Sequence, residues 1–141
     1  PALLLFVLVL VGVADSFAYL AGHLFGRTKL APHLSPGKTV EGLLGGLASV
    51  VVLAALWGLW FTDRSGGHLV AWLGLAMTTM LFSVVGDLAE SRLKRLAGVK
   101  DSGRLLPGHG GVLDRIDAFT AAAPIFLLGW IVLFQAPAQL P

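Results

Sequence analysis

Apolar stretches long enough to cross a lipid bilayer dominate this sequence. The first covers residues 2–25, and Leu, Val, Ala and Gly make up most of it. About 20 apolar residues in a helix span the hydrocarbon core, which is roughly 30 Å thick. The charged fraction of 13% is about half of the ~25% found in soluble domains. We therefore expect an integral membrane protein, and the composition excludes an ordinary soluble enzyme.

The stretches predict an all-α integral membrane protein that forms one membrane-embedded catalytic domain over residues 1–141. The sequence begins at Pro1, directly before the first apolar run, with no initiator Met or charged segment. We therefore expect a C-terminal fragment of a longer chain, not a protein that starts with a signal peptide. About four transmembrane helices are expected, at residues 2–25, 40–61, 68–95 and 115–135.

Lysine and arginine are unevenly distributed among the segments that connect these helices. The first connection carries three, the second one, the third six, and the tail after the last helix none. Lys and Arg are enriched in cytoplasmic connections. The pattern predicts a multi-pass protein of the inner (cytoplasmic) membrane, with both polar loops and the active site facing the cytoplasm.

Charge is concentrated in one segment, residues 86–117, which holds five of the eight acidic residues and six of the ten basic ones. Charge beside a membrane is costly and by default indicates a functional site. Three carboxylates, Asp87, Asp114 and Asp117, flank a glycine-rich basic loop. Oxygen ligands without any cysteine favour Mg²⁺ over zinc. A Mg²⁺ site is therefore predicted, with a second cation as a further candidate.

Small and basic residues in the same segment are suited to phosphate. Gly110 and Gly111 would let backbone N–H groups approach an anion near the start of the fourth helix. His109 could donate a hydrogen bond to phosphate or carry a proton. The basic cluster around Lys94 and Arg95 could bind reacting phosphates or only hold anionic lipid headgroups, and the sequence leaves both readings open.

Polar residues also interrupt the first half of the chain. An acid at the depth of Asp15 must face protein or water, either as a hydrogen-bonded group between helices or as part of a site. Further on, Ser35-Pro36-Gly37 predicts a turn. Thr39 is expected to cap the next helix, with Glu41 adding negative charge at its positive end.

Glycines cluster near the start of the second helix, at Gly42, Gly45 and Gly46. Small residues let membrane helices approach closely. A structural role in helix contact is therefore expected for them, not ligand binding.

Two strings of the sequence resemble a known family. SRLKRLAGVKDSGRLLPGHGGVLDRID, residues 91–117, resembles the signature of phosphatidate cytidylyltransferases (CDP-diacylglycerol synthases). DSFAYLAGHLFGRTKLAPHLSPGKTVEGLLGG, residues 15–46, resembles an upstream region of the same family. Phe17 and Val40 depart from the family pattern, which commonly has glycine and tryptophan there. These departures affect local packing and not the chemistry.

The resemblance implies a nucleotidyltransferase of phospholipid biosynthesis. It would transfer CMP from CTP to phosphatidate, forming CDP-diacylglycerol and pyrophosphate, by direct attack of the lipid phosphate on the α-phosphorus with the help of Mg²⁺. The implied partners are CTP, phosphatidate and membrane lipid, with a homodimer as a candidate assembly and no nucleic acid.

The expected site residues combine the signature with the charge pattern. The catalytic candidates are Asp87, Lys94, Arg95, His109, Asp114, Arg115 and Asp117. The substrate-binding candidates are Asp15, Ser35, Lys38, Thr39, Glu41, Ser91, Lys100, Asp101, Arg104, Gly110 and Gly111. The metal candidates are Asp87, Asp114 and Asp117.

Two other functions remain open at this stage. One is a CTP-dependent lipid kinase, or a nucleotidyltransferase for a polyisoprenoid or ether lipid, because lipid tails leave little trace in such motifs. The other is a cation transporter that uses Asp15, Asp87 and Asp114 as a relay. A transporter, however, has no need of the glycine-rich loop.

Overall fold

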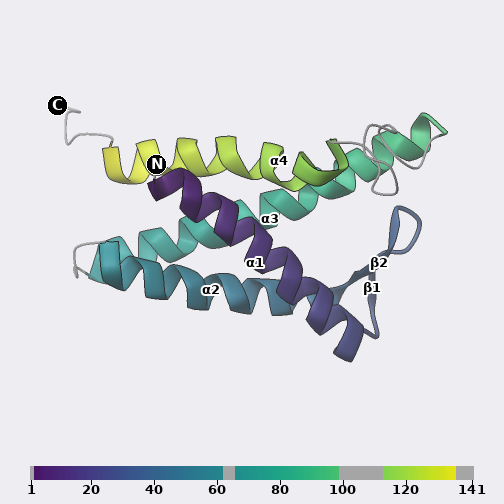
Figure 1. Ribbon diagram of the computed structural model, residues 1–141, viewed down its shortest axis with the longest axis horizontal. Coiled ribbons are helices and arrows are strands. Elements are labelled where there is room, and N and C mark those ends of the chain that lie inside the picture. Colours follow the sequence, from purple (N-terminus) through teal and green to yellow (C-terminus); the bar gives the residue numbers. More distant parts are fainter. Residues whose placement is uncertain (1, 62–65, 99–112, 136–141) are drawn as a thin grey trace.

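Four helices and a short two-stranded ribbon make up the described part of the computed structural model, which covers residues 2–61, 66–98 and 113–135 (Figure 1). The elements are α1 (Ala2–Phe25), β1 (Lys29–Ala31), β2 (Ser35–Thr39), α2 (Val40–Phe61), α3 (Gly66–Leu96), α4 (Leu113–Trp130) and a π-helical turn (Ile131–Gln135). Helices α2 and α4 run roughly along the long axis, whereas α1 and α3 are oblique to it and slope in opposite directions (Figure 1).

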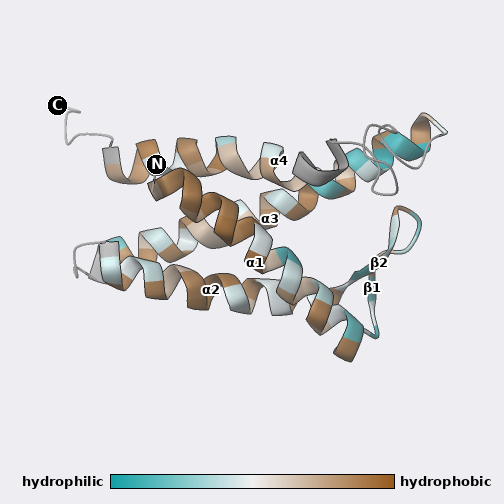
Figure 2. Ribbon diagram, in the orientation of Figure 1, coloured by the Kyte–Doolittle hydropathy of each residue, from teal (hydrophilic) through white to brown (hydrophobic). Residues whose placement is uncertain are grey.

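The predicted membrane fold is confirmed. Within the described residues, three helices are long and apolar enough to cross a bilayer, at Ala2–Phe25, Val40–Trp60 and His68–Leu96. A shorter apolar helix, Ala118–Phe134, accompanies them. Hydrophobic residues predominate along the helices, whereas hydrophilic residues gather at the β1–β2 hairpin and the end of α3 (Figure 2).

Aromatic rings form the centre of the core at the end of the bundle away from the hairpin. Phe6 of α1 is fully buried. The centroid of its ring lies 4.6 Å from that of Trp72 and 5.7 Å from that of Phe126. The indole N–H of Trp72 donates to the carbonyl of Ala54, 2.9 Å away. Large buried rings of this kind supply much of the packing energy, and the hydrogen bond satisfies the one polar group of Trp72.

Glycines allow α1 and α2 to pack closely, as the sequence predicted. A Cβ on Gly42 would lie 2.7 Å from the carbonyl oxygen of Ala18, and one on Gly45 would overlap the Cβ of Ala21. Separations this short leave no room for a side chain. The two helices are therefore held at a distance that only glycine permits at these positions.

The first polar loop contains an antiparallel ribbon that was not predicted. Ser35-Pro36-Gly37 begins β2 and does not form the turn, so that prediction was wrong. The turn lies at residues 32–34, where the N–H of Leu34 donates to the carbonyl of Ala31. Proline lacks a donor but is tolerated in an edge strand or beside an irregularity, and the register of this ribbon shifts between Lys29 and Ala31.

The start of α2 anchors the ribbon. The N–H of Gly42 donates to the Thr39 hydroxyl at 3.1 Å, which confirms the predicted helix cap. Both carboxylate oxygens of Glu41 accept from the N–H of Thr28 at 3.2 Å. The N–H of Val40 donates to the carbonyl of Thr28 at 2.9 Å. These bonds fix the base of the hairpin against α2.

Candidate active site

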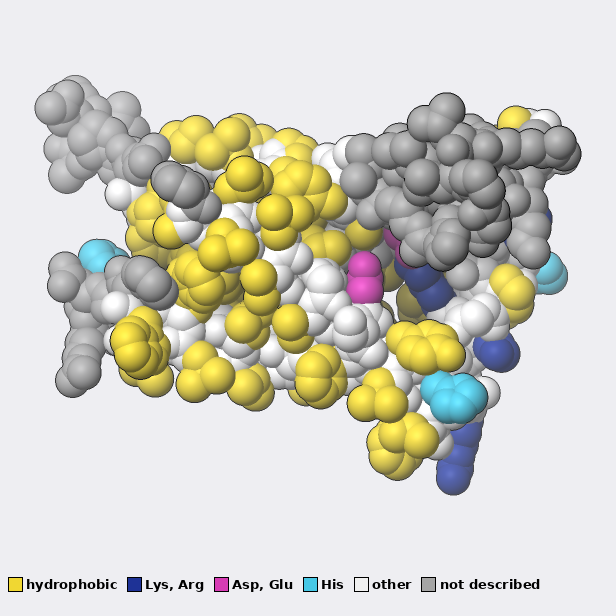
Figure 3. Space-filling view, viewed as in Figure 1, with side chains coloured by type: hydrophobic (Ala, Val, Ile, Leu, Met, Phe, Trp, Pro, Cys, Tyr) yellow, Lys and Arg dark blue, Asp and Glu magenta, His cyan; other side chains and the backbone are white. Residues whose placement is uncertain are grey.

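A pocket of about 590 Å³ opens where α1, the hairpin, the start of α2 and α3 meet. Its volume is in the range of small-molecule sites, about 300–1,000 Å³. Acidic and basic side chains border a hollow beside the apolar surface at this end (Figure 3). The polar side chains in its lining are Asp15, Tyr19, His23, Lys29, Ser35, Lys38, Thr39 and Asp87.

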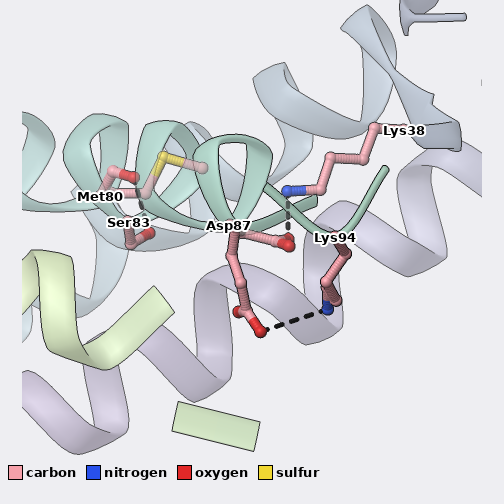
Figure 4. A network of polar contacts seen from close by, with 6 residues as sticks. Lys38, Met80, Ser83, Asp87 and Lys94 are labelled. Atoms are coloured by element: carbon pink, nitrogen blue, oxygen red, sulfur yellow. Dashed lines mark hydrogen bonds and ion pairs between the residues drawn. The ribbon is translucent and has the colours of Figure 1, made fainter. Parts of the chain in front are cut away.

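An ion pair joins the hairpin to α3 across this pocket. The ammonium of Lys38, on β2, contacts the carboxylate of Asp87, on α3 (Figure 4). The two side chains are 26% and 31% exposed. Charges that are partly withdrawn from water interact more strongly than a pair on an open surface. The pair therefore contributes to the position of both residues in the pocket wall.

A second pair lies one turn further along α3. The Lys94 ammonium is 3.2 Å from a carboxylate oxygen of Glu90, and the side chains are 17% and 12% exposed. The Glu90 oxygens are buried and accept no hydrogen bond from the described part of the chain. Lys94 is thus the compensating charge for a buried acid, and removing it would leave that acid uncompensated.

The structure brings five of the eighteen predicted site residues together. Asp15, Ser35, Lys38, Thr39 and Asp87 all line the same pocket. The Thr39 hydroxyl is engaged in capping α2, and Thr39 as a whole is only 6% exposed.

The remaining predicted residues lie apart from this lining or beyond the described residues. Glu41 binds the hairpin base, Ser91 is half-buried on α3, and Arg95 is exposed. Lys100, Asp101, Arg104, His109, Gly110 and Gly111 lie outside the described residues, as do the side chains of Asp114, Arg115 and Asp117 at the start of α4.

Three polar residues of the pocket lining were missed from the sequence: Tyr19, His23 and Lys29. Asp15, Tyr19 and His23 are spaced by four residues, which places them on one face of α1. That spacing of polar groups in an apolar stretch was the available signal. The rings of Tyr19 and His23 stack, with centroids 6.1 Å apart and planes 9° from parallel.

The donor set suits a hard cation. Asp15 of α1 and Asp87 of α3 both contribute carboxylates to the pocket lining, and Mg²⁺ prefers such ligands. Within the part of the chain that the structure describes, no three His, Cys, Asp or Glu residues form a metal-binding group. The two carboxylates of the pocket lining are chemically compatible with Mg²⁺, and Asp87 is a described residue that would hold it.

Curated proteins from several bacteria are similar to this chain. Phosphatidate cytidylyltransferase of Haemophilus influenzae is 51% identical over 126 residues, which are 88% of this chain and 44% of that protein. The enzyme of the same name from Pseudomonas aeruginosa is 51% identical over 136 residues, 96% of this chain and 50% of that protein. The enzyme of the same name from Thermotoga maritima is 43% identical over 132 residues, which are 92% of this chain and 49% of that protein. The chain thus spans about half the length of the curated relatives it matches.

A solved structure shares the fold. It is described as "Structural insight into an intramembrane enzyme for archaeal membrane lipids biosynthesis", and it superposes with a TM-score of 0.63. The match covers 87% of this chain and 75% of the other, at 24% sequence identity. The cytidylyltransferase family itself matches residues 2–133. By this match and by the similarity to its curated relatives, the chain belongs to the cytidylyltransferase family.

Proposed function

We propose that the protein containing this chain transfers CMP from CTP to phosphatidate, forming CDP-diacylglycerol and pyrophosphate. One observation carries the proposal: Asp15 and Lys38, which the family resemblance implied, line the same pocket as Asp87. The name that the relatives share, phosphatidate cytidylyltransferase, indicates the proposed substrates. Membrane lipid is the third proposed partner, and a homodimer stays a prediction.

In the proposed reaction, an oxygen of the lipid phosphate forms a bond to the α-phosphorus of CTP. The bond from that phosphorus to the bridging oxygen breaks, and pyrophosphate leaves. A phosphomonoester is largely dianionic at neutral pH, since its second pKa is about 6, so it needs no strong general base. The main requirements are alignment of two anions and neutralisation of the charge that develops on the leaving group.

The residues of this chain would meet these requirements from two sides of the pocket. Lys29 and Lys38 of the hairpin would attract and orient phosphate groups. Asp87, with Asp114 and Asp117 as further proposed ligands, would hold Mg²⁺, which when bound supplies neutralising positive charge. The neighbouring surface of α1 is apolar and exposed at Leu20 and Leu24, which suits contact with acyl chains.

We propose an orientation with the pocket toward the cytoplasm of a bacterial inner membrane. The hairpin, the end of α3 and the start of α4 lie at one end of the bundle (Figure 1). The connections at that end carry nine of the chain's ten Lys and Arg residues, against one elsewhere. This asymmetry supports the orientation through the positive-inside rule.

The test is an assay of the full-length protein with CTP labelled in the base and in the terminal phosphate. With phosphatidate present, we expect labelled CDP-diacylglycerol and one pyrophosphate released per lipid consumed. Transfer of the terminal phosphate to a lipid, with CDP as product, would instead identify a kinase. No turnover with phosphatidate, but turnover with another lipid phosphate, would reassign the lipid substrate.

The basic end of α3 provides a test of phosphate binding against lipid anchoring. Lys94→Ala should lower turnover steeply, because it removes a proposed phosphate ligand and leaves buried Glu90 uncompensated. Arg95→Ala, at an exposed position, should also lower turnover if Arg95 binds a reacting phosphate. Turnover would be measured in vesicles with increasing anionic lipid and decreasing salt.

The matched control is Arg92→Ala, which removes an exposed charge from the same helix end. If all three variants lose turnover and anionic vesicles restore it, the basic residues at the end of α3 serve only to anchor the protein to the membrane.

A further inference from the structure

The carboxylate proposed to hold a cation is already neutralised by a lysine. The Lys38 ammonium contacts Oδ2 of Asp87, and both side chains lie in the pocket wall with about three-tenths or less of their surface exposed. Figure 4 shows Lys38 reaching from the hairpin to α3. A divalent cation that binds Asp87 would therefore meet a positive charge at the same carboxylate.

Two cations cannot share this carboxylate without strong repulsion. A metal ion bound to the same carboxylate oxygen as the ammonium would lie about 4 Å from it, and repulsion at that distance is large in a partly desolvated pocket. The hairpin base cannot easily withdraw, because Glu41 and Val40 bind it to α2 through Thr28. Rotation of the flexible Lys38 side chain away from Asp87 would relieve the repulsion between the two cations.

The second lysine–carboxylate pair of α3 is built differently. Lys94 and Glu90 lie on one helix, and both are more buried than Lys38 and Asp87. Glu90 and Lys94 are also absent from the pocket lining. The pair of Lys94 and Glu90 is held within one helix, whereas the pair of Lys38 and Asp87 joins two elements across the pocket.

We propose that Lys38 is the exchangeable counter-ion of Asp87. A divalent cation that binds Asp87 releases the ammonium, which then binds a phosphate of the nucleotide. Cation and nucleoside triphosphate therefore favour each other's binding, and by linkage each raises the affinity for the other by the same factor. The identity of the anion rests on the proposed function, but the competition between Lys38 and a cation does not.

The experiment measures binding to the full-length protein in detergent, with Mn²⁺ as the probe. Lys38→Met should raise Mn²⁺ affinity at least about tenfold without nucleotide, because the competing ammonium is gone. In the same variant, Mg²⁺ should improve CTP affinity much less than it does in the wild type. Lys38→Arg keeps the positive charge and should leave Mn²⁺ affinity near that of the wild type. Melting temperatures establish that each variant is folded.

Lys29→Met is the matched control. It removes the same charge from the same pocket wall, but the described residues contain no ion pair between Lys29 and an acid. Its Mn²⁺ affinity should rise no more than about twofold, since charges without direct contact are screened by salt.

Equal Mn²⁺ affinities in the two Met variants would overturn the exchange, even if CTP binds normally. An undiminished effect of Mg²⁺ on CTP affinity in Lys38→Met would also overturn it. A wild-type protein that does not bind CTP would instead reject the proposed function.

Discussion

Asp87→Asn is expected to lower the turnover of the full-length protein at least about a thousandfold while leaving it folded. Asp87 is the described carboxylate that lies in the pocket opposite Lys38. Loss of a metal ligand in a reaction between two anions typically raises the barrier by several kcal/mol, and about 4 kcal/mol corresponds to a thousandfold. Asparagine keeps the shape of the side chain, so the packing of α3 should change little.

Initial rates with CTP and phosphatidate would be measured beside melting temperature. Ser83→Ala is the matched control, since Ser83 lies one turn earlier on α3 and its hydroxyl donates only to the carbonyl of Met80 on the same helix. It should retain most of the turnover. Activity of Asp87→Asn within tenfold of the wild type would remove Asp87 from the proposed metal site.

Gly45→Leu is expected to destabilise the bundle by roughly 3 kcal/mol or more, or to prevent folding altogether. Even the first carbon of the new side chain would overlap the Cβ of Ala21 and lie 3.3 Å from the carbonyl oxygen of Phe17. Overpacking of this kind typically costs 1–3 kcal/mol in soluble cores, and here backbone atoms leave little room to adjust. Since α1 and the hairpin border the pocket, substrate binding should be lost with the fold.

Gly74→Leu provides the comparison, because a Cβ at Gly74 would meet no atom within 4 Å. Both variants would be followed by thermal melting and by the monodisperse fraction recovered in detergent. Similar melting of the two variants would show that α1 and α2 do not depend on close approach at Gly45.

The helices were largely predictable because long apolar runs and charged connections are local properties of the sequence. The ribbon was not, since its pairing includes a register shift between Lys29 and Ala31 that no periodicity reveals. Pro36 also misled the prediction, because proline is as compatible with an edge strand as with a turn.

The site was predicted in part. The resemblance placed Asp15 and Lys38 among its residues, and the structure brings both to the pocket of Asp87. Contact between Lys38 and Asp87 joins two distant segments, so no spacing in the sequence could have indicated it. The roles of Asp114 and Asp117 stay predictions, since their side chains lie outside the described part of the chain.

The length of α3 bears on how deep in the bilayer the lipid would react. Its 31 residues extend for about 46 Å at 1.5 Å per residue, whereas the hydrocarbon core takes up only about 20 residues. Counted from Gly66, that core ends close to Asp87. Asp87 would then lie level with the phosphate groups of the surrounding lipids. A phosphatidate molecule could reach it by lateral diffusion alone, with its acyl chains never leaving the hydrocarbon, and only the nucleotide would have to come from water.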